Sequence, residues 1–188
     1  MKSITLLFSL ALAISCSRPA ADLPKLYPVP NASLIADSGK PIQLDAMKGQ
    51  VTVYDFIFTH CGASCPMMTA NMSRITKAID RDAPVRFVSI SVDPQHDTPA
   101  VLRQYASHVR TDPRWIFLTG NGGAIANLSE KGFKLAAIAA VPSGAEPLLH
   151  STKFVVADKQ GFIRAYCDGT VNDAVDQVAG TVRDLLRE

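Results

Sequence analysis

A pair of cysteines at the end of an apolar segment constrains this chain more than any other feature. Residues 51–58, VTVYDFIF, are β-branched, aromatic and apolar, which predicts a buried strand. Cys61 and Cys65 follow in the loop HCGASCP, and Pro66 suits the first turn of a helix. Apolar residues then recur at helical spacing at Met68, Met72, Ile75 and Ile79. The chain therefore places a dithiol where a buried strand passes into an amphipathic helix.

The rest of the chain alternates between strand and helix patterns. Strands are predicted at 85–92 and 115–120, and helices from the cap Thr98 with Pro99 and over 122–131. Residues 151–158 and 161–167 flank a turn and predict a β-hairpin. The last helix is predicted to carry Val171, Val175, Val178, Val182 and Leu185 on one face. This order indicates a thioredoxin-like α/β fold, a central mixed β-sheet flanked by helices on both faces.

The first residues have the pattern of a secretory signal. Lys2 precedes the apolar residues 4–14, which are too few to span a bilayer as a helix. The following AISC resembles the lipobox of bacterial lipoproteins, in which Cys16 becomes the acylated first residue. We therefore expect a signal peptide over 1–15 and a periplasmic protein anchored in the membrane through lipid on Cys16. The alternative is plain secretion, with Cys16 removed or free.

The expected mature chain is one domain with a leading tether. Residues 16–33 contain Pro19, Pro24, Pro28 and Pro30 and predict an extended tether. Residues 34–188 then form the domain. The net charge is +2, from 19 basic and 17 acidic residues without a Lys/Arg cluster, which argues against nucleic acid as a partner. We expect a monomer.

The position of the cysteines sets their chemistry. Cys65 is predicted at a helix N-terminus, where thiolate is favoured, and thiolate is both the nucleophile of disulfide exchange and a soft metal ligand. Cys61 and Cys65 are therefore candidates for a redox-active pair or for metal ligands, and a structural disulfide is the alternative. Cys167 alternates with Ile163 and Ala165 on one strand face, which favours a buried and inert thiol over an intermolecular disulfide.

Three segments together resemble the SCO/SenC family. They are FIFTHCGASCP (56–66), SVDPQHDTP (91–99) and HSTKFVVADKQG (150–161), in the typical order and spacing. The resemblance implies a thioredoxin fold that binds a copper ion, Cu(I) or Cu(II), through Cys61, Cys65 and His150. It also implies a partner, either the copper-binding subunit of cytochrome c oxidase or another copper chaperone. Without the resemblance, His150 would be an ordinary surface histidine.

Two residues depart from the family pattern. Gly62 stands where proline is frequent between the cysteines, and Leu149 stands where many members have an acidic residue. Leu149 removes a negative charge next to the histidine, so it bears on copper affinity and on partner recognition.

Other polar and sulfur side chains near the cysteines allow two interpretations each. Asp55 interrupts the apolar strand six residues before Cys61, where thioredoxins have a buried carboxylate that accepts a proton during exchange. It is a candidate proton relay; alternatively it lies at the sheet end, hydrated or paired with a lysine. His60, His96 and His108 are expected to be solvent-facing, and Met68 and Met72 to lie in the core. The role of Met67 is open.

The resemblance to the SCO/SenC family implies a copper-binding metallochaperone rather than an enzyme. It would deliver copper to a respiratory cytochrome oxidase or prepare the thiols of that oxidase. The rival is an enzyme, a thiol-disulfide oxidoreductase that reduces client cysteines in the periplasm. A peroxiredoxin-type peroxidase is a distant third. His150 separates the first two, because copper binding needs an imidazole and disulfide exchange does not.

Overall fold

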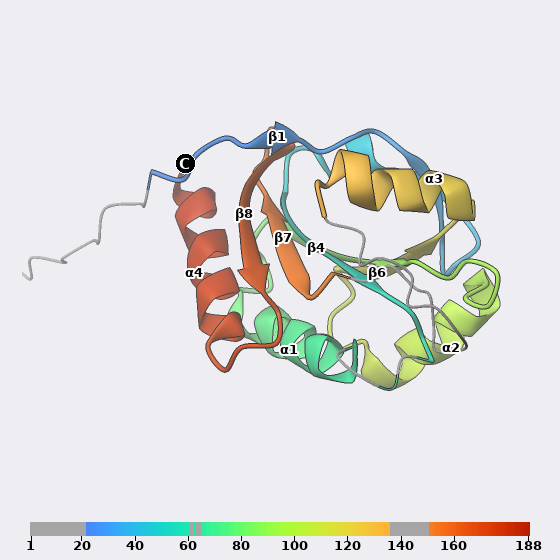
Figure 1. Ribbon diagram of the computed structural model, residues 1–188. Coiled ribbons are helices and arrows are strands. Elements are labelled where there is room, and N and C mark those ends of the chain that lie inside the picture. Colours follow the sequence, from blue (N-terminus) through green and yellow to red (C-terminus); the bar gives the residue numbers. More distant parts are fainter. Residues whose placement is uncertain (1–21, 61, 63–64, 136–150) are drawn as a thin grey trace, which may run out of the picture.

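The computed structural model describes residues 22–60, 62, 65–135 and 151–188 of the chain. Within these residues eight strands form one sheet, in the order β1-β8-β7-β4-β5-β6-β2-β3 (Figure 1). The strands are β1 Tyr27–Pro28, β2 Ser33–Ala36, β3 Pro41–Gln43, β4 Val51–Ile57, β5 Val85–Ser91, β6 Trp115–Thr119, β7 Lys153–Ala157 and β8 Phe162–Asp168. The central strands β4, β5 and β6 are parallel, and the other pairings are antiparallel. The mixed sheet of the sequence prediction is confirmed.

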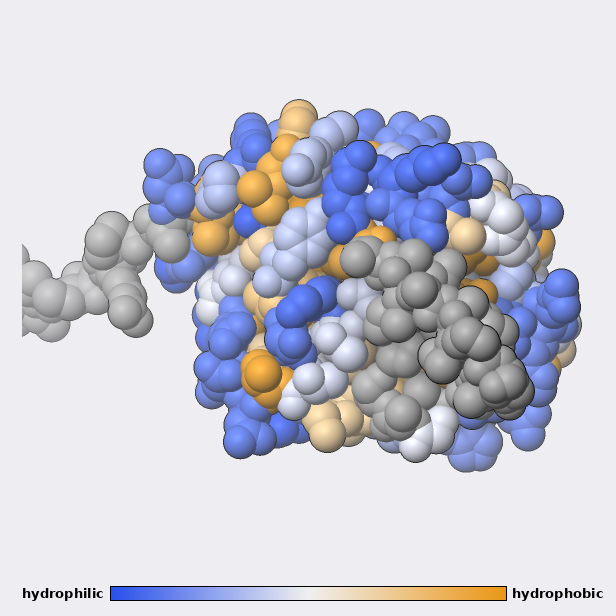
Figure 2. Space-filling model, in the orientation of Figure 1, coloured by the Kyte–Doolittle hydropathy of each residue, from blue (hydrophilic) through white to orange (hydrophobic). Residues whose placement is uncertain are grey.

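Helices cover both faces of this sheet (Figure 1). The helices α1 Cys65–Ala78, α2 Pro99–Val109 and α4 Ala174–Arg187 pack on one face. The other face carries α3 Gly122–Asn127, the π-helical turn η2 Leu128–Gly132 and the 3-10 turn η1 Leu44–Met47. None of the helices in the described part of the chain is long and apolar enough to cross a membrane. Polar side chains predominate over the described surface in Figure 2.

The strand β4 lies at the centre of the fold, and all seven of its residues are buried. Val53 and Ile57 face the core under α1, α2 and α4, whereas Tyr54 and Phe56 face the core under α3. A strand covered on both faces reads as a continuous apolar run. This burial on both sides explains why residues 51–58 lack the usual alternation of apolar and polar residues.

The helical core stripes are largely as the sequence predicts. Met68, Met72, Ile75 and Ile79 are at most 4% exposed. Thr98 caps α2 by accepting a hydrogen bond from the Val101 amide. The prediction for the last helix is wrong at Val171, which precedes α4 and is 39% exposed. The helix begins at Ala174, which is buried.

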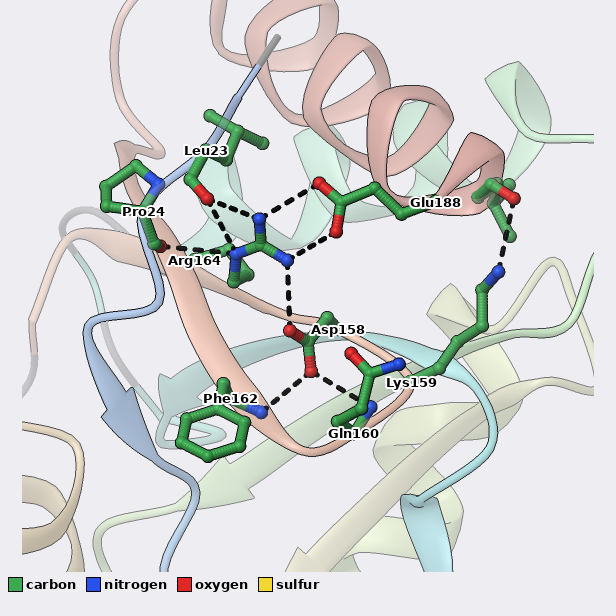
Figure 3. Close-up of polar contacts among 9 residues, drawn as sticks. Leu23, Pro24, Asp158, Lys159, Gln160, Phe162, Arg164 and Glu188 are labelled. Atoms are coloured by element: carbon green, nitrogen blue, oxygen red, sulfur yellow. Dashed lines mark hydrogen bonds and ion pairs between the residues drawn. The ribbon is translucent and has the colours of Figure 1, made fainter. Parts of the chain in front are cut away.

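The tether expected over 16–33 needs correction in its second half. Tyr27 pairs with Ile163, so β1 is an edge strand of the sheet. The carbonyls of Leu23 and Pro24 accept hydrogen bonds from the buried guanidinium of Arg164 (Figure 3). Residues 22–33 therefore belong to the folded domain, because residues 26–29 are hydrogen-bonded to residues 161–163 and Ser33 pairs with Gln43 of β3. Proline is tolerated there because an edge strand leaves some of its N–H groups unused.

The predicted hairpin is present, with an irregularity that changes one assignment. Val156 pairs with Ala165 and Ala157 with Ile163, so Arg164 is an extra residue in β8. This bulge turns Ile163 to the core under α3, whereas Cys167 lies in the core under α1 and α4. The prediction that they share a face is therefore wrong. Cys167 is nevertheless a buried free thiol, and burial raises its pKa, in agreement with the expected inert cysteine.

Candidate metal centre

The candidate site lies at the sheet edge where β4 and β5 end. Because these strands are parallel, the segments that follow them emerge at the same edge. Residues 58–60 follow β4 and lead to the cysteine loop, and residues 92–97 follow β5. The Val92 amide donates to the Ile57 carbonyl (2.8 Å), which keeps the two exits together. Residues 58–60, which lead to Cys61, and residues 92–97 of the SVDPQHDTP motif are thus neighbours in space.

The strand β7 begins at this edge as well. It runs antiparallel to β4, with Tyr54 opposite Val155, so its first residues lie toward the end of β4. The Gly169 amide donates to the Thr152 carbonyl (2.6 Å). A Cβ atom on Gly169 would lie 3.0 Å from Met68 Cε. The start of β7 therefore lies beside the first turn of α1, the turn that begins with Cys65.

Cys65 is the first residue of α1, and its side chain is 2% exposed. A cavity of about 410 Å³ adjoins it between α1 and α2, with Phe58, Thr59, Pro66, Thr69 and Tyr105 among its lining residues. The hydroxyls of Thr69 and Tyr105 are hydrogen-bonded (2.8 Å). The amide groups of a first helical turn have no partners within the helix and favour a thiolate there. Cys65 thus lies at a helix N-terminus that favours its thiolate form, and it borders a cavity lined by apolar side chains and by hydroxyl groups.

Asp55 is enclosed in the core on the α1 side of the sheet. It is 0% exposed, and the Ser89 hydroxyl donates to its Oδ1 (2.6 Å). Trp115 Nε1 in turn donates to Ser89 Oγ (2.9 Å). Oδ2 has no hydrogen-bond partner among the described residues. Burial raises the pKa of Asp55 to about 7. The described hydrogen-bond partner of Asp55 is a serine and not a lysine, and its role as a proton relay stays a prediction.

The other sulfur and imidazole residues fall into three groups. Cys16, Cys61, Leu149 and His150 lie outside the described residues, so their roles stay predictions. Met68 and Met72 are fully buried in the core, as predicted, whereas Met67 is 51% exposed. His60, His96 and His108 are exposed, as predicted.

The sequence interpretation missed a contact between two of these histidines. The ring centroids of His60 and His96 lie 4.5 Å apart. His60 follows Thr59, which donates two hydrogen bonds to Asp97, and His96 is the residue before Asp97. The contact could have been predicted from two parallel neighbouring strands, β4 and β5, each of which is followed by a histidine. Parallel strand ends converge, so polar residues after neighbouring strands are expected to meet.

The family model for SCO1/SenC matches residues 29–187 of the chain. The chain belongs to the SCO1/SenC family. A curated relative, a SCO1 protein homolog from Bacillus subtilis, is 32% identical over 85% of this chain and 83% of its own. A protein named as a putative copper-binding protein from Stutzerimonas stutzeri is 28% identical over 88% of this chain and 81% of its own.

Solved structures of SCO1/SenC proteins share the fold. A SCO1/SenC family lipoprotein from Bacillus anthracis has a TM-score of 0.78 at 28% identity and covers 88% of this chain and 98% of its own. BsSco, described as a cytochrome c oxidase assembly protein with a disulfide switch, has a TM-score of 0.73 at 32% identity. That alignment covers 86% of this chain and 94% of BsSco. The thioredoxin-like architecture predicted from the sequence is confirmed by these neighbours.

Proposed function

We propose that this SCO1/SenC protein binds one copper ion through Cys61, Cys65 and His150 and serves the assembly of a respiratory cytochrome oxidase. The observation that carries the proposal is the position of Cys65, the first residue of a helix at the sheet edge where β4 ends and β7 begins. The sequence puts Cys61 directly after the residues that follow β4. It also puts His150 three residues before the first residue of β7. Cys61 and His150 are thus each within four residues of a strand end that lies near Cys65, so the chain is long enough for the three ligands to meet.

The donor set fits copper. Two thiolates and one neutral imidazole are soft and borderline ligands that suit Cu(I), and an added ligand would allow Cu(II). Phe58 and Thr69 are buried next to Cys65 and line the cavity beside it. Relatives support the same cargo, since the Stutzerimonas stutzeri protein is named as copper-binding. The copper would be held as cargo for transfer to the copper-binding subunit of the oxidase or to another copper chaperone.

The proposed location is the periplasmic face of a bacterial membrane. The AISC segment at residues 13–16 supports acylation of Cys16, and the Bacillus anthracis neighbour is described as a lipoprotein. Lipid attachment would hold the domain near a membrane-bound oxidase without a transmembrane helix.

The second candidate function is thiol-disulfide exchange with a client protein. It is favoured by Asp55, a carboxyl group that burial keeps partly protonated near neutral pH. In this reaction Cys61 and Cys65 would form a disulfide, and their two electrons and two protons would convert a client disulfide into two thiols. BsSco is described as having a disulfide switch, which supports a redox role for the cysteine pair proposed here.

Competitive titration of copper against a chelator separates the two functions. We expect the wild type to bind one Cu(I), and Cys61→Ser or Cys65→Ser to remove most of this binding, because one thiolate and one imidazole make a poor Cu(I) site. His150→Ala should weaken Cu(I) modestly and Cu(II) severely, yet leave dithiol-disulfide exchange largely intact. Wild-type binding no stronger than that of the double-cysteine variant would exclude the copper carrier and leave the reductase.

A further inference from the structure

Two imidazoles and two carboxylates gather beside the cysteine loop without any part in the site described above. His60 follows β4, and His96 lies in the segment after β5; their rings are 4.5 Å apart and inclined by 60°. His60 Nε2 is 3.8 Å from Asp93 Oδ2. One ring nitrogen of each histidine and one carboxylate oxygen of Asp97 all lie within 4.8 Å of one another.

A buried carboxylate fixes this arrangement. Asp97 is 0% exposed and accepts hydrogen bonds from the Thr59 amide (3.1 Å), the Thr59 hydroxyl (2.5 Å) and the Ser91 hydroxyl (2.6 Å). Thr59 is the residue before His60, and Asp97 is the residue after His96. These hydrogen bonds therefore fix the distance between the backbones of His60 and His96. Two histidines on a mobile part of the surface would have no fixed distance between them. Packing of the His60 ring against Phe58 (5.1 Å between centroids) restricts it further.

The carboxylates keep ligand capacity. An ionised carboxylate accepts about four hydrogen bonds, and the described contacts of Asp97 use three. Asp93 Oδ1 accepts from the His96 amide (3.4 Å), and its Oδ2 faces His60. Both histidines are exposed, so an ion can reach their nitrogens from solvent.

We propose that His60, His96 and the carboxylates of Asp93 and Asp97 form a second metal site, selective for Cu(II) over Cu(I). Imidazole and carboxylate ligands in a tetragonal arrangement suit Cu(II), which also binds nitrogen and oxygen ligands most strongly among the divalent first-row ions. Metal–nitrogen bonds of about 2.0 Å place ligand atoms on opposite sides of the ion about 4 Å apart. The ligand atoms of His60, His96 and Asp97 lie within 4.8 Å of one another, so small side-chain rotations would bring them to this distance. No thiolate takes part, so the site stands independently of the proposed function.

The site would give the protein two copper positions of different chemistry on one edge of the sheet. The thiolates suit the reduced ion, and the histidine pair suits the oxidised ion that prevails in an oxidising compartment. Neither His60 nor His96 contributes to the hydrophobic core, so either can be replaced without opening a cavity in it.

The test is Cu(II) binding by a chain that lacks the thiolate site. The variant Cys61→Ser/Cys65→Ser/His150→Ala is titrated with Cu(II) against a chelator, and its electron paramagnetic resonance spectrum is recorded. We expect one tightly held Cu(II) with hyperfine coupling to two nitrogens. Adding His96→Ala should weaken binding at least about tenfold, since loss of an outer-shell partner alone costs 10–100-fold, and should remove one nitrogen coupling. Adding His108→Ala instead, an exposed histidine at the end of α2, should change neither.

A second measurement covers the case in which the triple variant does not fold. Wild-type protein loaded with one Cu(I), which gives no paramagnetic signal, should show the same two-nitrogen spectrum on adding Cu(II), and His96→Ala should lose it. The proposal is overturned if His96→Ala leaves the affinity and the nitrogen couplings unchanged, or if neither protein holds Cu(II). A wild type that binds no Cu(I) while the triple variant binds Cu(II) would instead overturn the proposed function alone.

Discussion

At the scale of single residues, Asp55 shows how the core sets the chemistry of one group. Its carboxyl lies in the middle of a buried strand with one hydroxyl donor, from Ser89, and one oxygen without a described partner. Burial penalises the charged form and raises the pKa from 3.8 to about 7. The group is thus able to exchange a proton near neutral pH.

This raised pKa predicts a specific dependence of stability on pH. Between about pH 4 and pH 7 the folded state binds more protons than the unfolded state, so the free energy of unfolding falls as pH rises. The fall should approach roughly 4 kcal/mol, because one pKa unit corresponds to about 1.4 kcal/mol. Asp55→Asn, which cannot ionise, should abolish most of this decline in urea unfolding at pH 5 and pH 8. It should also slow dithiol-disulfide exchange near pH 7 while leaving copper stoichiometry unchanged.

Asp112 provides the matched control. Hydrogen bonds from Arg114 lower its pKa, so its contribution to stability is present at neutral pH and is lost on acidification. Asp112→Asn should therefore destabilise the protein at neutral pH without removing the decline above pH 4. If Asp55→Asn leaves exchange untouched and changes only stability, the carboxyl is structural and not a relay.

The residue scale also shows what sequence can and cannot reveal about a site. Asp55 was identifiable because a charged side chain interrupts an apolar strand, and Cys65 because it lies where that strand passes into a helix. The contact between His60 and His96 was not, because it depends on hydrogen bonds from Thr59 and Ser91 to Asp97 across two strands. Local sequence patterns predict the face of the sheet on which a side chain lies. To predict a contact between residues that follow two different strands, one must also know that the two strands are neighbours in the sheet.

At the scale of elements, one buried guanidinium joins three parts of the fold. Arg164, in the bulge of β8, binds Asp158 Oδ2 (3.0 Å) and Glu188 at the end of α4 (2.6 Å), as well as the Leu23 and Pro24 carbonyls (Figure 3). The carboxylates and hydrogen bonds raise the pKa of Arg164 further above its usual value. Arg164 therefore connects β8 to the N-terminal segment at Leu23 and Pro24 and to the C-terminal residue Glu188.

Loss of this residue should separate the N-terminal segment from the sheet. Arg164→Met keeps the aliphatic volume but leaves Asp158 buried without its cation, so we expect a loss of about 3–5 kcal/mol in urea unfolding. The control Arg187→Ala removes an exposed ion pair with Asp184 and should cost less than about 1 kcal/mol. Equal effects of the two variants would show that the Arg164 network adds no more than a surface pair.

The same elements show why the edges of the sheet were missed from the sequence. The central strands β4, β5 and β6 have five to seven residues, largely buried and rich in β-branched or aromatic side chains, which is a strong strand pattern. The edge strands β1 and β3 have two and three residues and contain Pro28 and Pro41. Such short segments form strands only because a neighbour offers backbone groups, and local sequence does not specify that neighbour.

At the scale of the whole molecule, the proposed lipid anchor would determine where the domain works. Cys16→Ser should abolish incorporation of labelled fatty acid and should either release the domain in soluble form or leave the signal uncut. Cys167→Ser is the control, because that thiol is buried in the core and should not affect labelling. Unchanged acyl labelling and membrane retention of Cys16→Ser would exclude the anchor.

The central claim, that this fold holds copper between the two cysteines and His150, is tested most directly by X-ray absorption at the copper edge. Protein loaded with one Cu(I) should show two sulfur ligands and one nitrogen ligand, because thiolate is the preferred donor for Cu(I). His150→Ala should keep both sulfurs and lose the nitrogen. A first shell with fewer than two sulfurs in the wild type, or a nitrogen that persists in His150→Ala, would contradict the proposed site.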